Sequence, residues 1–427
     1  MKHKIHLHKS KRVLLQNTLM LYILTFSNYL LSFALVPYES RVLKPEAYGD
    51  LGVASAIMVY FQLFIDFGFL LSGTQEVSMY RDNQERLRHI TTTITCCKLL
   101  LAGMSAVILT ILCQALPAWQ GRWGFYMLFF LGTAFNSLIP DYLYRGLEKM
   151  GAITVRTVCI KVFFTLCILL FLKRPEDVWM VPFFTAVGNA VAMVCCFLHL
   201  SRKLGIRFCR ISCSDIWQSL RSSSVFFYSR IATTAYSALN TIILDFISAS
   251  GATTGYYTSA ERLITTGKNA LSPISDSLYP YMVKNRDFAL AKKVLLILEP
   301  IIFVFCTCCF IWAEPLCRLI FGSSYAPAGQ VLRAMLPVGV VILPSYILGF
   351  PVLSAMGMPK HANYSVVFGS AIHMVNLLIL FCTGNINMVT LGAAMSLAET
   401  LILGYRVVVI WRHRDILQKG IQHGKAS

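Results

Sequence analysis

The 427-residue sequence has few charged residues and especially few acids. Asp, Glu, Lys and Arg together make up 14% of it, whereas a soluble domain carries about 25%. Apolar residues instead form runs of about 20, long enough to cross roughly 30 Å of hydrocarbon. The composition therefore excludes a soluble protein and predicts an all-α polytopic membrane protein. A cleaved signal peptide is not expected, because the first apolar run is too long and no A-x-A site follows it.

Sequence motifs of the common enzyme classes are also absent. The segment Gly267-Lys268-Asn269 lacks the earlier glycine and the Ser or Thr of an ATP-binding P-loop. The sequence contains no H-E-x-x-H, G-x-S-x-G or D-x-D pattern, and the loops expected on the outer face are too short to hold an active site. We therefore expect no enzymatic activity and no cofactor.

Neither the cysteines nor the net charge indicates a soluble-protein function. Most of the 14 cysteines lie inside apolar runs without a His or an acid at ligand spacing, where they behave as small buried hydrophobic residues rather than as metal ligands. The net charge of +18 is not concentrated in a soluble domain, so nucleic-acid binding is not expected. Lys and Arg instead follow the loops expected in the cytoplasm, as in other membrane proteins.

Apolar segments predict the membrane-spanning helices. The eighth is too polar to face lipid, and it spans only if its polar side faces other helices or water. The twelve predicted segments are 13–37, 49–72, 90–114, 123–144, 151–172, 177–200, 222–249, 252–280, 294–313, 330–354, 362–382 and 387–411. The first two are joined by a short polar link, which predicts a helical hairpin.

The distribution of Lys and Arg predicts the orientation in the membrane. If the N-terminus is cytoplasmic, that side carries about four times as many Lys and Arg residues as the opposite side. This bias supports an even number of spans with both termini in the cytoplasm. We predict two six-helix lobes related by pseudo-twofold symmetry. Residues 1–200 form the N-terminal lobe, 201–221 a cytoplasmic linker, and 222–427 the C-terminal lobe with a short tail.

Cations inside the predicted spans are the candidates for a substrate site. Arg230, Arg262 and Lys268 lie within the seventh and eighth segments. A charged residue at a helix centre costs about 2.5–3.5 kcal/mol, so it is expected to face a wet cavity or another charge. Cations outnumber acids in the spans, which suits an anion, and the arginine fork suits a phosphate. Ion pairs within the protein are the alternative for these three residues.

Other charged residues have weaker assignments. Lys161 lies deep in the fifth segment. Three further cations lie within about two turns of a cytoplasmic helix end and are expected to extend toward the membrane surface; these are Lys98, Arg156 and Arg406.

Two acids are candidates for coupling transport to protons or sodium. Asp66 is the only acid in the apolar run FQLFIDFGFLL, and Glu261 precedes Arg262. A carboxylate in a low-dielectric site can take up a proton or bind a cation. A structural, hydrogen-bonded acid is the alternative for Asp66.

A series of short motifs resembles the Wzx-type polysaccharide, or O-antigen, flippases of the multidrug/oligosaccharidyl-lipid/polysaccharide (MOP) exporter superfamily. The resemblance covers nearly the whole chain, and the order of the motifs along the chain makes it specific. The motifs are PYESRVL at 37–43, YG at 48–49, DFGF at 66–69, RD at 81–82, PDYLYRGLEKM at 140–150, YYTSAER at 256–262, SPISDSLYP at 272–280, FGSSY at 321–325, GFP at 349–351 and AMG at 355–357. Arg145 departs from the uncharged residue that the family often has there, and we assign it no role.

The resemblance implies a V-shaped bundle that moves undecaprenyl-diphosphate-linked oligosaccharide repeat units across the bacterial cytoplasmic membrane by alternating access. Arg230, Arg262 and Lys268 would hold the diphosphate, with Lys161 and Arg41 as further candidates. The expected partners are the lipid-linked oligosaccharide, membrane lipid, and polysaccharide polymerase or chain-length proteins. The alternatives are a cation-coupled multidrug exporter of the same superfamily, a lipid II flippase, and a membrane polysaccharide polymerase or ligase.

Overall fold

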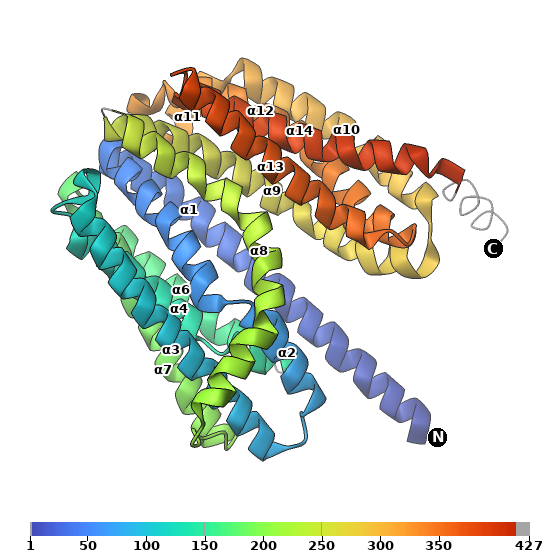
Figure 1. Ribbon diagram of the computed structural model, residues 1–427. Helices are drawn as coiled ribbons and strands as arrows, with labels where there is room; N and C mark the ends of the chain where they lie inside the picture. The colour runs from blue at the N-terminus through green and yellow to red at the C-terminus, as the bar shows by residue number, and fades with distance from the viewer. Residues whose placement is uncertain (1, 148–149, 249, 416–427) are drawn as a thin grey trace. The chain divides into compact units, whose positions relative to one another are not determined.

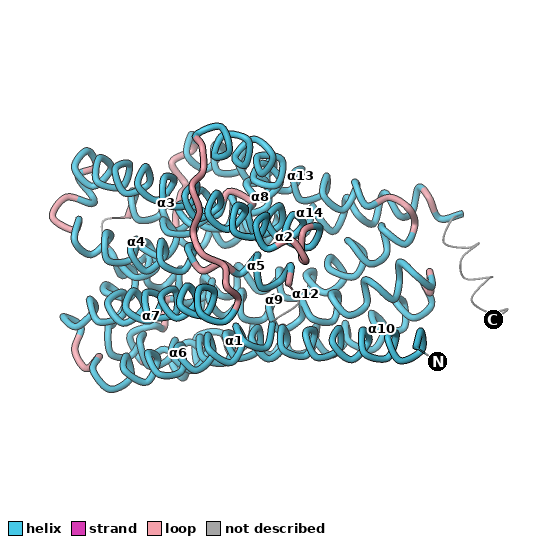
Figure 2. The backbone as a smooth tube through the Cα atoms, turned by 90° about the horizontal axis from the view of Figure 1, so that it is seen from below, coloured by secondary structure: helices cyan, strands magenta, loops and turns pink. Residues whose placement is uncertain are grey.

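A computed structural model describes residues 2–147, 150–248 and 250–415, and inside the helices it leaves some side chains undescribed, those of Arg156 and Arg230 among them. The described chain is helical, with short connecting loops except for the longer stretch of residues 204–212 (Figure 2). The α-helices are α1 (Lys2–Asp66), α2 (Phe69–Met79), α3 (Gln84–Ala115), α4 (Trp123–Leu138), α5 (Asp141–Gly146), α6 (Met150–Phe171), α7 (Met180–Lys203), α8 (Cys213–Ile247), α9 (Gly251–Asn285), α10 (Phe288–Ile311), α11 (Ala313–Phe321), α12 (Ala328–Ile347), α13 (Pro359–Cys382) and α14 (Met388–Arg412). The π-helical turn η4 (Leu348–Leu353) continues α12.

Each of the twelve predicted segments falls on one or two of these helices, so the predicted all-helical membrane fold is confirmed. Among the described residues, seven spans are long and apolar enough to cross a membrane by length and composition. They are Ala34–Met79, Gln84–Ala115, Pro175–Lys203, Phe288–Ile311, Ala328–Leu353, Pro359–Cys382 and Met388–Arg412. Five predicted segments are not among them. The segment at 123–144 is missing because α4 has only 16 residues, and the segment at 252–280 because α9 is too polar. The segments at 13–37, 151–172 and 222–249 contain side chains outside the described residues.

The predicted hairpin at the start of the chain has a tighter turn than expected. Helix α1 consists of two helical arms (Figure 1), and the only non-helical residue inside it is Lys44, with φ 60° and ψ 172°. A positive φ is uncommon for a residue with a Cβ, and Pro45 follows directly. The two helical arms are therefore joined by one residue in a strained conformation, in place of the polar link predicted between residues 38 and 46.

The described chain forms two compact units. Unit 1 contains residues 1–43 and 54–231, and unit 2 contains residues 44–53 and 232–427. Residues 204–212, between α7 and α8, thus lie inside unit 1. The division into two symmetry-related lobes at a 201–221 linker stays a prediction.

Residues 44–53 belong to unit 2 because they pack tightly against α9. A Cβ added to Gly255 would run into the carbonyl oxygen of Pro45, and one added to Gly49 would run into the carbonyl oxygen of Gly251. Tyr48 is fully buried, and its ring makes an edge contact with that of Tyr325, 6.1 Å away. Glycine permits the close backbone approach here, so these small residues attach ten residues of the opening hairpin to unit 2.

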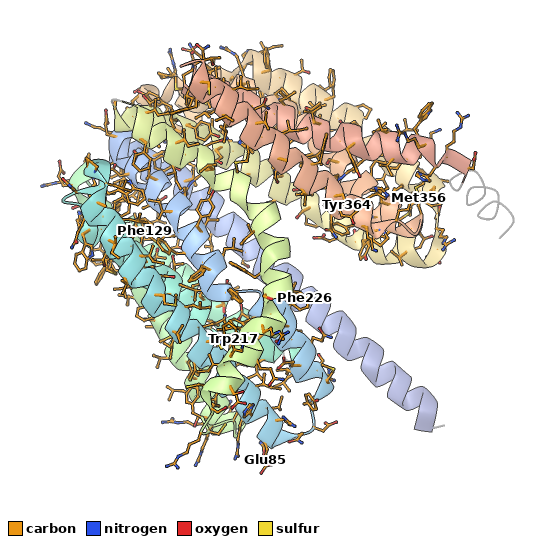
Figure 3. All side chains as sticks on the ribbon, in the orientation of Figure 1. Glu85, Phe129, Trp217, Phe226, Met356 and Tyr364 are labelled. Carbon is orange, nitrogen blue, oxygen red and sulfur yellow. The ribbon has the colours of Figure 1, made fainter. Side chains whose placement is uncertain are left out.

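In unit 1, a break separates α1 from α2. Phe67 has φ 39° and Gly68 has φ 79°. A Cβ on Gly68 would lie 2.7 Å from the Cβ of Phe226 (Figure 3) and 3.0 Å from the carbonyl oxygen of Ser223, both on α8. The ring of Phe67 stacks on that of Phe227 at 4.3 Å. The break therefore requires glycine at position 68 and is covered by α8.

Candidate functional site

A cavity of about 380 Å³ in unit 2 contains the largest gathering of charged side chains among the described cavities; we call it the α9–α14 cavity. Helices α9, α12, α13 and α14 and the turn η4 surround it. It is lined by Lys268, Ser272, Ser275, Asp276, Ile342, Ser345, Tyr346, Phe350, Val366, Glu399, Ile402 and Arg406. Two cations and two acids therefore line one cavity, together with serine hydroxyls and apolar side chains.

The central contact of this cavity is an ion pair. The ammonium of Lys268 on α9 donates to Oε1 of Glu399 on α14 at 2.6 Å. The Glu399 side chain is 4% exposed and that of Lys268 is 19% exposed. A buried pair of this kind is strongly destabilised when one partner is removed, because the other charge is left uncompensated. Lys268, predicted as a phosphate ligand, thus lies on a cavity and also takes part in an ion pair.

Arg406 is the second cation of the cavity. Its guanidinium donates to the hydroxyl of Ser365 at 2.8 Å, to the hydroxyl of Ser345 at 2.9 Å, and to the carbonyl oxygen of Ser345. A Cβ on Gly349 would lie 2.8 Å from its Nη1, so glycine in η4 makes room for the guanidinium. Arg406 is 6% exposed. The prediction that it extends to the membrane surface is therefore wrong.

The other predicted residues of α9 lie elsewhere in unit 2. Glu261 accepts a hydrogen bond from the hydroxyl of Thr241 at 3.2 Å. The guanidinium of Arg262 lies 5.4 Å from the centre of the buried Tyr48 ring, which is a cation–π contact. Arg262 thus contacts the 44–53 segment, and neither residue lines the α9–α14 cavity.

A hydrogen-bonded network joins α8, α9 and α13 within unit 2. Nε2 of His373 lies 2.9 Å from Oδ1 of Asn240, and the Asn240 amide donates to the hydroxyl of Tyr257 at 2.9 Å. All three residues are buried. The network holds the three helices together, which agrees with a structural rather than a catalytic histidine.

In unit 1, Asp66 is paired with a cation. The ammonium of Lys98 on α3 donates to Oδ1 of Asp66 at 3.1 Å and to the carbonyl oxygen of Ser137 at 2.5 Å. The Lys98 side chain is 6% exposed, so the prediction that it extends to the membrane surface is wrong. Asp66 ends α1 at the break before α2, and the pair connects this break to α3 and α4.

The remaining candidates belong to unit 1. Lys161 on α6 lines a second cavity, within unit 1. Arg41 is exposed on α1 in unit 1. Arg230 lies on α8, and its side chain is outside the described residues. Glu399 and Arg406 are not among the site residues predicted from the sequence, because nothing local to α14 reveals their partners on α9, α12 and α13.

The sequence is similar to known proteins over most of its length. The family described as "Polysaccharide biosynthesis protein" matches residues 14–286. A protein of Escherichia coli (strain K12) described as "Putative O-antigen transporter" is 26% identical over 400 residues, which cover 92% of this chain and 95% of that protein.

Two solved structures have the same fold. The lipid II flippase MurJ in an inward closed conformation matches with a TM-score of 0.68 at 11% identity, over 95% of this chain and 90% of that one. An inward-facing multidrug resistance MATE family transporter of the MOP superfamily matches with a TM-score of 0.65 at 12% identity, over 91% and 95% of the two chains. The predicted MOP-type fold is confirmed, and the similar proteins are transporters rather than enzymes.

Proposed function

This chain belongs to the polysaccharide biosynthesis protein family, and on that premise we propose that it moves lipid-linked oligosaccharide repeat units, carried on undecaprenyl diphosphate, across the bacterial cytoplasmic membrane by alternating access. The relative described as an O-antigen transporter supports this substrate class. The repeat units would serve the synthesis of a surface polysaccharide, O-antigen, capsule or exopolysaccharide.

The observation that carries the proposal is the pairing of Lys268 with Glu399 on the α9–α14 cavity, with Arg406 on the same wall. A diphosphate is recognised by ammonium and guanidinium groups through short charge-assisted hydrogen bonds. The hydroxyls of Ser272, Ser275 and Ser345 line the same space. Those of Ser272 and Ser275 donate to the carbonyl oxygens of Asn269 and Tyr346, whereas that of Ser345 accepts from Arg406 and can donate its own proton to a ligand. The site therefore offers the groups that a lipid diphosphate requires, inside the part of the chain that crosses the membrane.

The ion pair also suggests how binding is coupled to an ion. A phosphate that binds Lys268 displaces the carboxylate of Glu399. A buried carboxylate without a partner is costly, so Glu399 then takes up a proton or a sodium ion. Release of that ion restores the pair and expels the phosphate. We thus add Glu399 to the coupling acids proposed earlier, Asp66 and Glu261.

The other assignments remain parts of the proposal. Arg230, Arg262, Lys161 and Arg41 are further candidates for substrate binding, and both chain termini are placed in the cytoplasm. A polysaccharide polymerase and chain-length proteins would receive the product on the outer side.

The test is the sidedness of lipid-linked repeat units in a strain that depends on this protein. With wild-type protein, we expect surface polysaccharide and little accumulation on the inner leaflet. With Lys268→Gln, the repeat units are expected to accumulate on the inner leaflet. This variant leaves Glu399 buried without its partner. The double variant Lys268→Gln/Glu399→Gln is neutral at both positions, so it tests for the same loss of transport without leaving an unpaired charge.

Lys293→Gln, on an exposed position of α10, is the matched control and should transport normally. Normal surface polysaccharide in the well-expressed double variant would overturn the assignment of Lys268. Lack of transport by the wild type, combined with cation-dependent dye efflux, would identify a drug exporter. Rescue of a strain that lacks its lipid II flippase, without surface polysaccharide, would identify a lipid II carrier.

A further inference from the structure

A second polar cavity, of about 360 Å³, lies within unit 1; we call it the α4–α7 cavity. Its walls come from α1, α4, α6 and α7. Its volume is at the lower end of the roughly 300–1,000 Å³ typical of ligand pockets. It therefore has room for one small ligand and not for a whole oligosaccharide.

The polar wall of this cavity recurs with helical spacing. On α4, Thr133 and Asn136 follow Phe129, labelled in Figure 3; on α7, Thr185 precedes Asn189. Positions separated by three, four and seven residues share one helix face. The polar groups thus belong to continuous stripes on helices that are otherwise apolar, and polar residues in membrane helices mark ligand or ion sites.

Two of the amides remain available to a ligand. Among the described residues, no hydrogen bond is made by the side chain of Gln62 on α1 or of Asn136 on α4, and both are half-buried at the cavity wall. Asn189 differs, because its amide donates to the carbonyl oxygen of Gly132 at 2.9 Å and joins α7 to α4. A side-chain amide offers both donors and an acceptor, so Gln62 and Asn136 suit a ligand that also has both.

Aromatic rings complete the wall. Phe129, Phe164 and Phe184 line the cavity from three helices. A Cβ on Gly188 would lie 2.9 Å from a ring carbon of Phe164, so the glycine lets this ring pack against α7. Lys161 contributes the only charged group that lines the cavity among the described residues. Neutral amides and hydroxyls around aromatic faces are suited to a compact ligand rich in hydroxyls and with apolar C–H faces.

We propose that the α4–α7 cavity binds a single sugar residue of the transported oligosaccharide. The amides of Gln62 and Asn136 form hydrogen bonds with its hydroxyls, and the phenylalanine rings pack against its C–H face. This inference rests on the proposed function, because it places the sugar in unit 1 and the phosphate site in unit 2. A lipid tail does not suit this cavity, because it would leave the two amides without hydrogen-bond partners.

The test measures binding of free monosaccharides to the full chain in lipid nanodiscs by saturation-transfer NMR. The probes are N-acetylglucosamine, glucuronate and glucose, and a short alkyl maltoside probes the lipid-tail alternative through its alkyl protons. We expect at least one monosaccharide to show saturation transfer to wild-type protein. The double variant Gln62→Met/Asn136→Leu breaks no hydrogen bond recorded in the described chain, so it should fold, and it should bind about tenfold more weakly because two hydrogen bonds to the sugar are lost.

Asn376→Leu, on α13 of unit 2, is the matched control and should bind the sugar like wild type. Equal binding by the double variant and the wild type would overturn the inference, as would transfer to alkyl protons alone or to no probe. The inference and the proposed function can fail separately. Transport without sugar binding would remove only the inference, and sugar binding that depends on Gln62 and Asn136 without lipid transport would remove only the proposed function.

Discussion

The ammonium of Lys98 lies 3.1 Å from the carboxylate of Asp66, at the point where α1 ends. The sequence predicts Asp66 as a coupling acid because it is the only acid in an apolar run. The structure gives it a cation partner on α3 and places both beside the left-handed break at Phe67 and Gly68. A coupling role for Asp66 stays a prediction, and it would now require the pair to open.

Removing one member of this pair should destabilise unit 1. Asp66→Asn leaves the ammonium of Lys98 buried, with the carbonyl oxygen of Ser137 as its remaining recorded acceptor. We expect a loss of roughly 3–5 kcal/mol, as for other broken buried pairs, measured by thermal unfolding in detergent. The double variant Asp66→Asn/Lys98→Met should recover most of it. An unchanged melting temperature for Asp66→Asn would show that the pair does not stabilise the fold.

The contact between residues 44–53 and α9 should tolerate no added side chain. Gly255→Ala forces a Cβ against the carbonyl oxygen of Pro45, and we expect a cost of about 1–3 kcal/mol, as for overpacking of a core. Gly267→Ala, on the same helix with open space around its Cβ, is the control and should be neutral or stabilising by about 0.5–1 kcal/mol. Equal stability of the two variants would contradict the close approach.

The variant Arg262→Ala can distinguish a structural role of Arg262 from a role in binding the substrate. Its contact with the Tyr48 ring predicts a loss of about 0.5–2 kcal/mol for Arg262→Ala, measured by unfolding of the purified protein. If Arg262 also holds the diphosphate, the variant should accumulate lipid-linked repeat units on the inner leaflet. Normal surface polysaccharide with a well-expressed variant would remove Arg262 from the substrate site and leave only the structural contact.

The start of α8 should become less stable at acidic pH. Hydrogen bonds from the backbone and side chain of Ser212, together with the nearby His89, hold the pKa of Asp215 below its ordinary value. This stabilisation is present above the ordinary pKa of about 3.9 and is lost as the pH falls through the lower value of the folded state. The protection of the amides of residues 204–215 against hydrogen exchange, measured relative to their intrinsic exchange rates at each pH, should therefore fall at acidic pH.

Asp215→Asn is the control for this effect. Its side chain carries no charge in this range, so the protection of the same amides should already be low at neutral pH and should show no acid-dependent step. The same acid step in wild type and variant would assign the effect to another group.

The helices could be predicted from the sequence, but the side chains that pair between helices could not. A membrane-spanning helix needs a long apolar run, so each predicted segment falls on a helix of the structure. Even the polar α9 could be recognised as a helix. The ion pair of Lys268 joins residues 131 positions apart, and no periodicity reports such a pairing. Lys98 and Arg406 were assigned to the membrane surface from their distance to a helix end, which carries no information about which face is buried.

The α4–α7 cavity was partly visible in the sequence. On α4, Thr133 and Asn136 lie four and seven residues after Phe129, and on α6 Thr165 lies four residues after Lys161. A search for polar faces, rather than for charges alone, would have found these stripes. It would not have shown that α1, α4, α6 and α7 bring these residues around one space.

The ten residues that α1 contributes to unit 2 have a consequence for how the chain can be divided. A cut between residues 204 and 212 would yield two fragments, and neither contains a whole unit. The first fragment retains residues 44–53, which unit 2 needs against α9, and the second retains the start of α8, which covers the α1–α2 break of unit 1. The halves of the polypeptide are therefore interlocked, so they should co-purify when expressed as separate chains and fail to fold when expressed singly.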